Sequence, residues 1–228
     1  MVNNIPLFKC KVSDVPAKKL TVDRLNDISY SNITKKTPRD KLGNFVAIDT
    51  ETTGLSASTC EIIDIAAIRF RDFMPAQKIS MLLSPKKGLS EDAMLINHIT
   101  LDMVEGRPTF GQVAESLLSF IGNDNIVGHN LEFDLKFIVK GGADVTAQKR
   151  KYYDTLDIAQ RTLKKVRKKW DKDLESFEED YDSDYDVEDY KLGTLCDYYG
   201  IINTESHRAE GDAIAAGELL RHLADDRL

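Results

Sequence analysis

The chain has 228 residues, of which 42% are hydrophobic and 30% are charged, and its formal net charge is −7. This length suffices for one α/β core with an additional arm or insertion. No apolar run approaches the ~18–20 residues that cross a bilayer, and the N-terminus has no signal-peptide core, so we expect no membrane partner. The three cysteines, Cys10, Cys60 and Cys196, form no metal-binding pattern, which is typical of a reduced, cytoplasmic compartment.

The negative charge is concentrated in one block. Residues 171–190 hold 11 acidic side chains and one basic side chain, a local charge of −10, and the remainder of the chain sums to +3. The body is therefore mildly basic, and the overall sign of the charge does not exclude a nucleic-acid partner.

The first 41 residues form a basic N-terminal extension. They carry nine Lys or Arg and four Asp, and only an apolar spacing between residues 20 and 28 indicates a short helix. Contact with a phosphate backbone is one interpretation. A solvated extension, or packing at the edge of a sheet, explains the composition more simply, and we favour it.

The segment 45–55 is an apolar run that ends in two acids and then turns at Gly54. Its β-branched and aromatic residues predict a buried strand. Because side chains alternate along a strand, Asp49 and Glu51 project from the same face, roughly 6–7 Å apart along the backbone. Two such acids repel each other and resist burial, and a divalent metal between them is the simplest remedy. Taken alone, the segment is equally consistent with a polar strand end that runs into a loop.

Two more strands follow, at 61–70 and 78–83, the second stopped by Pro85. Three consecutive strands with short connections favour an antiparallel meander.

In the second half, helical spacing alternates with short apolar strands. The predicted helices are 108–121 with Thr109 as a candidate N-cap, 131–139 ended by Gly141-Gly142, 155 to about 166, 191–201 with a terminal glycine, and about 208–223. The predicted strands between them are 125–130 and 152–155. Alternating strands and helices imply parallel pairing, so we expect a mixed sheet with helices on its faces.

A basic run, 161–169, precedes an acidic run, 171–189. The two runs are able to pair with each other, and an acidic segment is also able to imitate a nucleic-acid backbone and regulate a site. We favour an exposed, partly disordered insertion, because like charges repel.

Two further acids stand out. Asp134 lies beside an apolar stripe on its predicted helix, an expensive place for an unpaired carboxylate. Asp212 and His207 flank the start of the last helix, where small residues such as Ala209 and Ala213 would allow close approach to a sheet.

Three motifs, in this order, resemble the DEDD exonucleases of the His subtype, the group that includes ribonuclease T and the proofreading epsilon subunit of bacterial replicative polymerases. They are Asp49-Thr50-Glu51-Thr52-Thr53-Gly54-Leu55, then His129-Asn130 with Phe133-Asp134 and Phe137, and then His207-Arg208-Ala209 with Asp212. One such motif is weak evidence, whereas three in order are specific. The resemblance covers about 44–223. It implies a ribonuclease H-like α/β fold with a mixed five-stranded sheet flanked by helices, and it makes 42–228 an exonuclease domain with an acidic insertion at about 170–190.

The resemblance also implies hydrolysis of phosphodiester bonds from the 3′ end, with release of nucleoside 5′-monophosphates. Asp49, Glu51, Asp134 and Asp212 are the implied ligands of two Mg²⁺ or Mn²⁺ ions, which lie about 3.5–4 Å apart in sites of this kind. His207 is the implied catalytic base.

A further set of residues is implied to position the substrate, namely Thr50, Thr52, Thr53, Gly54, Leu55, Asn97, His129, Asn130 and Phe133. Leu55 offers an apolar surface for a base, although the sequence is equally consistent with a core role for this residue. A strand-end hydrogen-bond network is the alternative for His129 and Asn130. The family often has His-Gly-Ile-Thr where this chain has Asn97-His98-Ile99-Thr100, so the contact of the family's histidine is not assigned to His98.

The leading interpretation is a 3′-to-5′ exonuclease on single-stranded DNA, in polymerase proofreading or repair, with a DNA polymerase as a candidate partner. An exoribonuclease that trims RNA 3′ ends is the alternative, because contacts to the 2′-hydroxyl decide between the two and no residue settles them. An inactive nucleic-acid-binding or polymerase-binding module is a third hypothesis. Its signature, the loss of a carboxylate or of His207, is absent.

Overall fold

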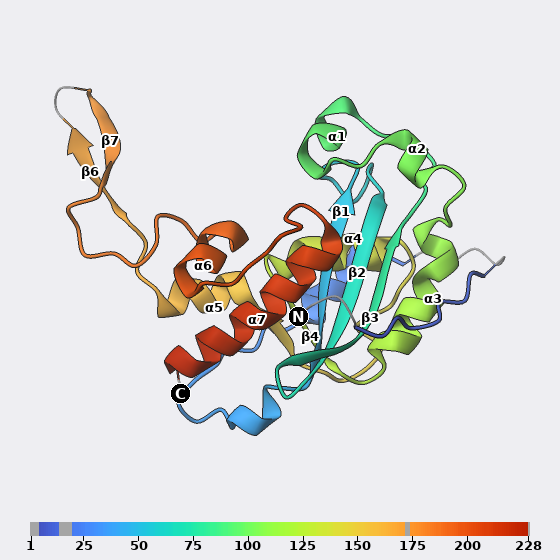
Figure 1. Cartoon of the computed structure of the whole chain (residues 1–228), viewed down its shortest axis with the longest axis horizontal. Coiled ribbons are helices and arrows are strands. Elements are labelled where there is room, and N and C mark those ends of the chain that lie inside the picture. The colour runs from blue at the N-terminus through green and yellow to red at the C-terminus, as the bar shows by residue number, and fades with distance from the viewer. Residues whose placement is uncertain (1–4, 14–19, 172–173, 228) are drawn as a thin grey trace.

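The computed structural model describes residues 5–13, 20–171 and 174–227. A five-stranded sheet with the strand order β3-β2-β1-β4-β5 forms its centre, and helices lie on both sides of it (Figure 1). The sheet strands are β1 (Phe45–Thr52), β2 (Ile62–Arg71), β3 (Met74–Leu82), β4 (Asn125–Gly128) and β5 (Tyr152–Asp154). A separate two-stranded sheet consists of β6 (Arg167–Asp171) and β7 (Ser176–Asp180).

Helices and loops make up the remaining described chain. They are α1 (Glu91–Asn97), α2 (Leu101–Val104), α3 (Phe110–Ile121), α4 (Leu131–Lys140), α5 (Thr155–Thr162), α6 (Leu192–Tyr199) and α7 (Ala209–Arg227), with short 3₁₀ helices η1 (Val22–Asp27) and η2 (Arg39–Lys41). Among the described residues, none of these helices is long and apolar enough to span a bilayer.

The pairing of the strands confirms the predicted mixed sheet. Strand β1 is central and pairs antiparallel with β2 and parallel with β4. Strand β3 extends the antiparallel side, and β5 extends the parallel side. The antiparallel meander and the parallel second half of the sheet both follow the sequence expectation.

Alternation along β1 divides the core into two layers. Phe45 and Ala47 belong to the cluster that α5, α6 and α7 cover. Val46 and Ile48 belong to the cluster that α3 and α4 cover. Successive side chains of a strand point to opposite faces, so a residue's position along β1 decides which helices it meets.

Helix α7 approaches the sheet closely because small residues make up most of its buried side. A Cβ atom built on Gly217 would lie 2.4 Å from Cζ of Phe70 in β2. The Phe70 ring is itself stacked on Phe45 of β1, with 4.7 Å between ring centroids. The glycine therefore sets the distance between α7 and the sheet.

Several predicted boundaries differ from the structure. Strand β3 begins at Met74, not at residue 78, because a tight turn at Asp72 and Phe73, both with positive φ, lets the hairpin pair from its first residues. Helix α5 ends at Thr162 and not near residue 166, since Leu163 adopts an extended backbone with its side chain buried. Helix α7 continues past residue 223 to Arg227.

Helices α1 and α2 were not predicted, because both are too short to show a helical period. Helix α1 nevertheless has a local signal, since Ser90 Oγ accepts a hydrogen bond from the Ala93 N–H at 3.2 Å. Capping of the first orphan N–H groups is a common start signal for helices. In α3, the expected start at Thr109 is confirmed, and its N–H donates to Gln112 Oε1 at 2.9 Å.

The described part of the N-terminal extension packs at the edge of the sheet, which is one of the two arrangements favoured from the sequence. The Phe8 N–H donates to the Lys78 carbonyl of β3 at 2.7 Å. The Phe8 ring contacts Phe120 of α3, with centroids 5.3 Å apart. The predicted short helix is the 3₁₀ helix η1, and residues 1–4 and 14–19 lie outside the described residues.

The basic and acidic runs pair with each other, which corrects our expectation of a partly disordered insertion for the residues described there. They form the β6–β7 hairpin, which projects from the body (Figure 1). Lys169 Nζ binds Asp180 Oδ1 at 2.8 Å, and the rings of Trp170 and Phe177 meet with centroids 5.1 Å apart. The buried side chain of Val187 anchors the base of the hairpin.

Replacement of Gly217 by Ala tests the close packing of α7. In a helix interior Ala is favoured over Gly by about 1 kcal/mol, but the new methyl group would meet the Phe70 ring. We expect Gly217→Ala to lower the free energy of unfolding by about 1–3 kcal/mol, as overpacking does. Urea unfolding measures this change.

Gly193→Ala in α6 is the matched control, since no atom of the described residues lies within 4 Å of the new Cβ. This variant should be neutral or more stable by up to about 1 kcal/mol. Equal stabilisation by the two substitutions would contradict the close approach of α7.

Candidate active site

Three acids meet where the end of β1 reaches the start of α7. Asp49 and Glu51 continue the side of β1 that faces α7, and Asp212 lies in the first turn of α7. Each contributes a carboxylate oxygen, and these oxygens lie within 4.8 Å of one another. We call these three residues the acidic cluster. It contains three of the four metal ligands that the sequence implied.

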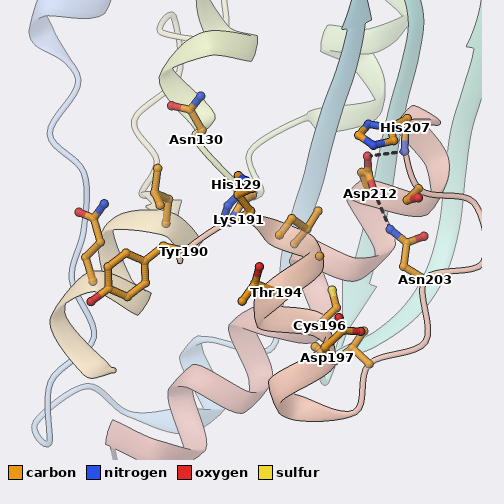
Figure 2. A pocket seen from close by; sticks show the side chains of 16 residues that line it. His129, Asn130, Tyr190, Lys191, Thr194, Cys196, Asp197, Asn203, His207 and Asp212 are labelled. Atoms are coloured by element: carbon orange, nitrogen blue, oxygen red, sulfur yellow. Dashed lines mark hydrogen bonds between the residues drawn. The ribbon is translucent and has the colours of Figure 1, made fainter. Parts of the chain in front are cut away.

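The carboxylate of Asp212 is oriented by the loop that precedes α7. Asn203 Nδ2 donates to its Oδ1 at 2.6 Å, and the backbone N–H of His207 donates to its Oδ2 at 3.1 Å (Figure 2). The loop lies tight against the helix, since a Cβ on Gly211 would come within 2.5 Å of the Glu205 carbonyl oxygen. Sequence reasoning missed Asn203, which belongs to no motif.

Asp134, the fourth implied ligand, reaches the end of β1 from the opposite face of the sheet. It lies on α4, is 3% exposed, and accepts a hydrogen bond from Thr50 Oγ1 at 2.6 Å. Thr50 stands between Asp49 and Glu51 and faces the other way, as alternation requires. Asp134 is therefore adjacent to the acidic cluster but is not one of the three acids that meet.

Burial and mutual repulsion raise the pKa values of these acidic side chains. Burial raises the pKa of Asp49 well above its usual value, and Asp134 raises it most among the neighbouring charges. Burial, followed by the charges of Asp212 and Asp64, raises the pKa of Glu51 to about 7. The pKa of Asp134 also rises to about 7, chiefly through burial. Each of these carboxylates resists ionisation while a compensating cation is absent.

The donor set suits a divalent cation. The acidic cluster offers only carboxylate oxygens, which are the ligands that hard ions such as Mg²⁺ and Mn²⁺ prefer. A positive ion among them would also offset the repulsion that raises their pKa values.

His207 sits beside the acidic cluster with an exposed side chain. Its backbone is left-handed, with φ of 62°. This conformation costs a residue with a Cβ about 1–2 kcal/mol, and the hydrogen bond from its N–H to Asp212 offsets part of that cost. The fold therefore couples the position of the imidazole to that of an acid.

A cavity of about 940 Å³ opens beside the acidic cluster and includes His207 and Asp212 in its wall (Figure 2). Part of the wall comes from residues that sequence reasoning did not single out, namely Tyr190, Lys191, Thr194, Cys196, Asn203 and Ser206. These residues lie between the hairpin and α7 in the chain and carry no motif, so only the tertiary structure identifies them.

His129 and Asn130 line the same cavity, on the side of β4 (Figure 2). The Nδ1 atom of His129 lies 3.0 Å from Thr155 Oγ1, and burial lowers its pKa to about 4, so the ring is neutral. The Asn130 N–H donates to Asp154 Oδ1 at 2.9 Å. These contacts form the strand-end network that was the alternative for this pair. Substrate contact by either residue stays a prediction.

The loop after β1 is held by its own threonines. Thr52 Oγ1 donates to the Gly54 carbonyl at 2.7 Å, and the Thr53 N–H donates to the Glu61 carbonyl at 2.9 Å. A Cβ on Gly54 would lie 2.8 Å from Cys60 Sγ, so the glycine permits a close approach. Leu55 is 89% exposed, which excludes a core role for it.

Asn97 and Phe133 have local structural contacts. Asn97 is 2% exposed, and its Oδ1 accepts a hydrogen bond from the Ile99 N–H at 3.0 Å at the end of α1. Phe133 packs against Phe137, with ring centroids 5.0 Å apart. Their implied contacts with substrate stay predictions.

Comparisons with known proteins point to one family. The family model RNase_T, described as exonuclease, matches residues 46–220. The chain is 30% identical to the DNA polymerase III subunit epsilon of Aquifex aeolicus over 192 residues, which cover 82% of this chain and 85% of that one. It is 32% identical to the PolC-type DNA polymerase III of Oceanobacillus iheyensis over 181 residues, which cover 78% of this chain but 11% of the relative.

The fold also resembles that of solved exonucleases. Escherichia coli exonuclease I in complex with a dT13 oligonucleotide superposes with a TM-score of 0.59 at 18% identity, over 79% of this chain and 40% of that one. This likeness supports the same fold, and it confirms the ribonuclease H-like architecture that the motifs implied.

The raised pKa values predict how stability depends on pH without divalent cations. The folded chain binds protons at Glu51 and Asp134 more tightly than the unfolded chain, whose carboxyls have pKa values near 4.5 and 3.8. The free energy of unfolding should therefore fall as the pH rises from about 4 through about 7. Urea unfolding in a chelator, followed across this range, measures the slope.

Two controls accompany that measurement. Glu51→Gln removes one of the titrating groups and should make the slope shallower. Saturating Mn²⁺ should reverse the trend, since a cation binds the ionised acids. Rising stability across the same range in the chelator would show that the acids are not held together as described.

Proposed function

This chain belongs to the RNase_T exonuclease family, and from that membership we propose that it is a metal-dependent 3′-to-5′ exonuclease on single-stranded DNA that releases nucleoside 5′-monophosphates. The observation that carries the proposal is the acidic cluster, in which Asp49, Glu51 and Asp212 converge beside the exposed imidazole of His207. Few arrangements other than cation binding justify three mutually repelling carboxylates, one of which, Asp212, lines a cavity.

We propose that the cation is Mg²⁺ or Mn²⁺, with two ions per site. Asp49, Glu51 and Asp212 would hold the first ion, and Asp134 would join Asp49 at the second. A bound ion supplies a water of lowered pKa and offsets negative charge on the phosphate. Thr50 contributes by holding the Asp134 carboxylate in place through its 2.6 Å hydrogen bond.

The chain's own residues supply proton transfer and positioning. His207 is the proposed base, because its imidazole lies at the cavity wall, where a ring nitrogen is able to accept a proton from the attacking water. Its backbone N–H anchors it to Asp212, so the base and a metal ligand keep a fixed relation. The exposed Leu55 at the end of the β1 loop is the proposed apolar surface for the terminal base.

DNA is the favoured substrate because relatives of this chain are DNA polymerase III subunits and a structural neighbour binds an oligo-dT strand. An exoribonuclease remains the alternative, since divalent cations held by carboxylates would promote attack of water on the phosphodiester bonds of DNA and RNA alike. Proofreading within or beside a DNA polymerase is the proposed biological role, and a polymerase is the proposed partner. The epsilon subunit and PolC-type relatives support this assignment.

Digestion of 5′-labelled single strands tests the function. With Mg²⁺ or Mn²⁺, the wild-type chain should shorten single-stranded DNA from the 3′ end and release nucleoside monophosphates, faster than it shortens RNA of the same sequence. Asp212→Asn should lower the rate by several orders of magnitude, because it removes a charged ligand without changing the size of the side chain.

Glu115→Gln, an exposed change on α3, is the matched control, and its rate should stay within about twofold of wild type. Faster shortening of RNA would favour the exoribonuclease. No cleavage of either strand by the wild-type chain would overturn the enzyme assignment and leave a binding module.

Removal of the proposed base separates proton transfer from metal binding. His207→Gln should lower kcat by about 10²–10⁴, the usual contribution of a general base. Its affinity for Mn²⁺, measured by calorimetry without nucleic acid, should remain close to wild type, because the backbone N–H that orients Asp212 is retained. An unchanged kcat would remove His207 as the base.

A further inference from the structure

An ion pair with one buried partner lies next to the acidic cluster and has no part in the function proposed so far. Arg208 Nε donates to Asp64 Oδ2 at 2.9 Å. The Asp64 side chain is 2% exposed, whereas that of Arg208 is 39% exposed. The second carboxylate oxygen of Asp64, Oδ1, is buried and has no hydrogen-bond partner among the described residues. Arg208 and Asp64 therefore share one hydrogen bond, and backbone N–H groups of Ala209 and Ile65 also stabilise the charged form of Asp64.

The register of the sheet places this pair beside Glu51. Asp64 of β2 is directly opposite Glu51 of β1 in the antiparallel ladder. Residues opposite each other share a face, with Cβ atoms about 4.5–5.5 Å apart. Two carboxylates in that relation repel each other, so a cation between or beside them is favoured. Arg208 is that cation in the structure, and its charge lowers the pKa of Glu51 while Asp212 and Asp64 raise it.

Arg208 has more than one possible partner there. A guanidinium carries five N–H donors and pairs readily with carboxylates. Its position in the chain, directly after His207 and at the start of α7, keeps it close to the acidic cluster whichever acid it binds. If Asp64 lost its charge, Glu51 would be the carboxylate opposite the vacated place. A guanidinium bound to Glu51 would compete with a metal ion for that ligand.

We propose that Asp64 is a positioning residue that acts through Arg208: it holds the guanidinium on β2, so that Glu51 stays available for a divalent cation. Asp64 thereby keeps the Arg208 guanidinium, whose charge acts on Glu51, from occupying the metal site. The inference rests on the proposed metal site, but it concerns the affinity for the cation and does not require the nuclease reaction.

Mn²⁺ binding measured by calorimetry, without nucleic acid, tests the proposal. Asp64→Asn should weaken Mn²⁺ binding by about 10–100-fold, the range seen when residues that orient metal ligands are changed. Arg208→Gln removes the competitor, and the double variant Asp64→Asn/Arg208→Gln should recover an affinity within about threefold of wild type. This recovery is the decisive result, because a pair that only tied α7 to the sheet would give a double variant as weak as the single ones.

A matched control comes from a second ion pair that joins the same helix start to the sheet. Lys78 of β3 pairs with Glu210 of α7, close in sequence to Arg208. Glu210→Gln loosens this attachment without freeing a cation beside Glu51, and we expect unchanged Mn²⁺ affinity. A loss of affinity in Glu210→Gln equal to that in Asp64→Asn would overturn the proposal in favour of general loosening of α7.

Urea unfolding of each variant accompanies the calorimetry. If Asp64→Asn alone does not fold, the double variant still decides, since the proposal requires near-normal Mn²⁺ affinity and a purely structural pair requires its loss. The nuclease assay separates the two levels of inference. Full recovery of metal binding in the double variant, with no cleavage by the wild-type chain, would retain this proposal and overturn the proposed function.

Discussion

Repulsion among half-buried carboxylates at the end of β1 is the constraint on which the rest of the structure depends. Carboxylate oxygens of Asp49, Glu51 and Asp212 lie within 4.8 Å of one another. The charge of Asp134, on the other side of the sheet, raises the pKa of Asp49 further. Such an arrangement works against folding unless each acid is held by other groups. The structure supplies hydrogen-bond donors for two of the four acids. A threonine donates to Asp134, and an asparagine and a backbone N–H donate to Asp212. A cation bound among the carboxylates would offset the repulsion that remains.

The scaffold is arranged to tolerate this repulsion. The apolar first half of β1 is covered on both faces, so the strand cannot shift to separate its terminal acids without exposing both cores. Helix α7 brings its acid to the same point because small residues, above all Gly217 against Phe70, let it lie close to the sheet. The stability of this packing thus maintains the geometry of the site, and the left-handed backbone at His207 is one local cost of it.

The β6–β7 hairpin shows the same compensation of charge on the surface. Its basic strand faces its acidic strand residue by residue, so a block that looks strongly acidic in the sequence is partly neutralised within the hairpin. The chain after the hairpin returns at Tyr190 and Lys191 to line the cavity beside the acids. The insertion is therefore connected to the wall of the site, while the β6–β7 hairpin, which carries the exposed Trp170 and Phe177, projects from the body (Figure 1).

The sequence by itself determined the features that depend on neighbours along the chain. Strand alternation fixed Asp49 and Glu51 on one face, helical spacing located α3, α4 and α7, and three ordered motifs identified the fold and the family. Only the tertiary structure decided that Asp134 arrives from the opposite face, that Asn203 orients Asp212, and that Asp64 pairs with Arg208. The physical reason is that periodicity states which side of its own element a residue occupies. Which residue contacts it from another element depends on how distant elements pack. The local sequence carries no signal of that packing.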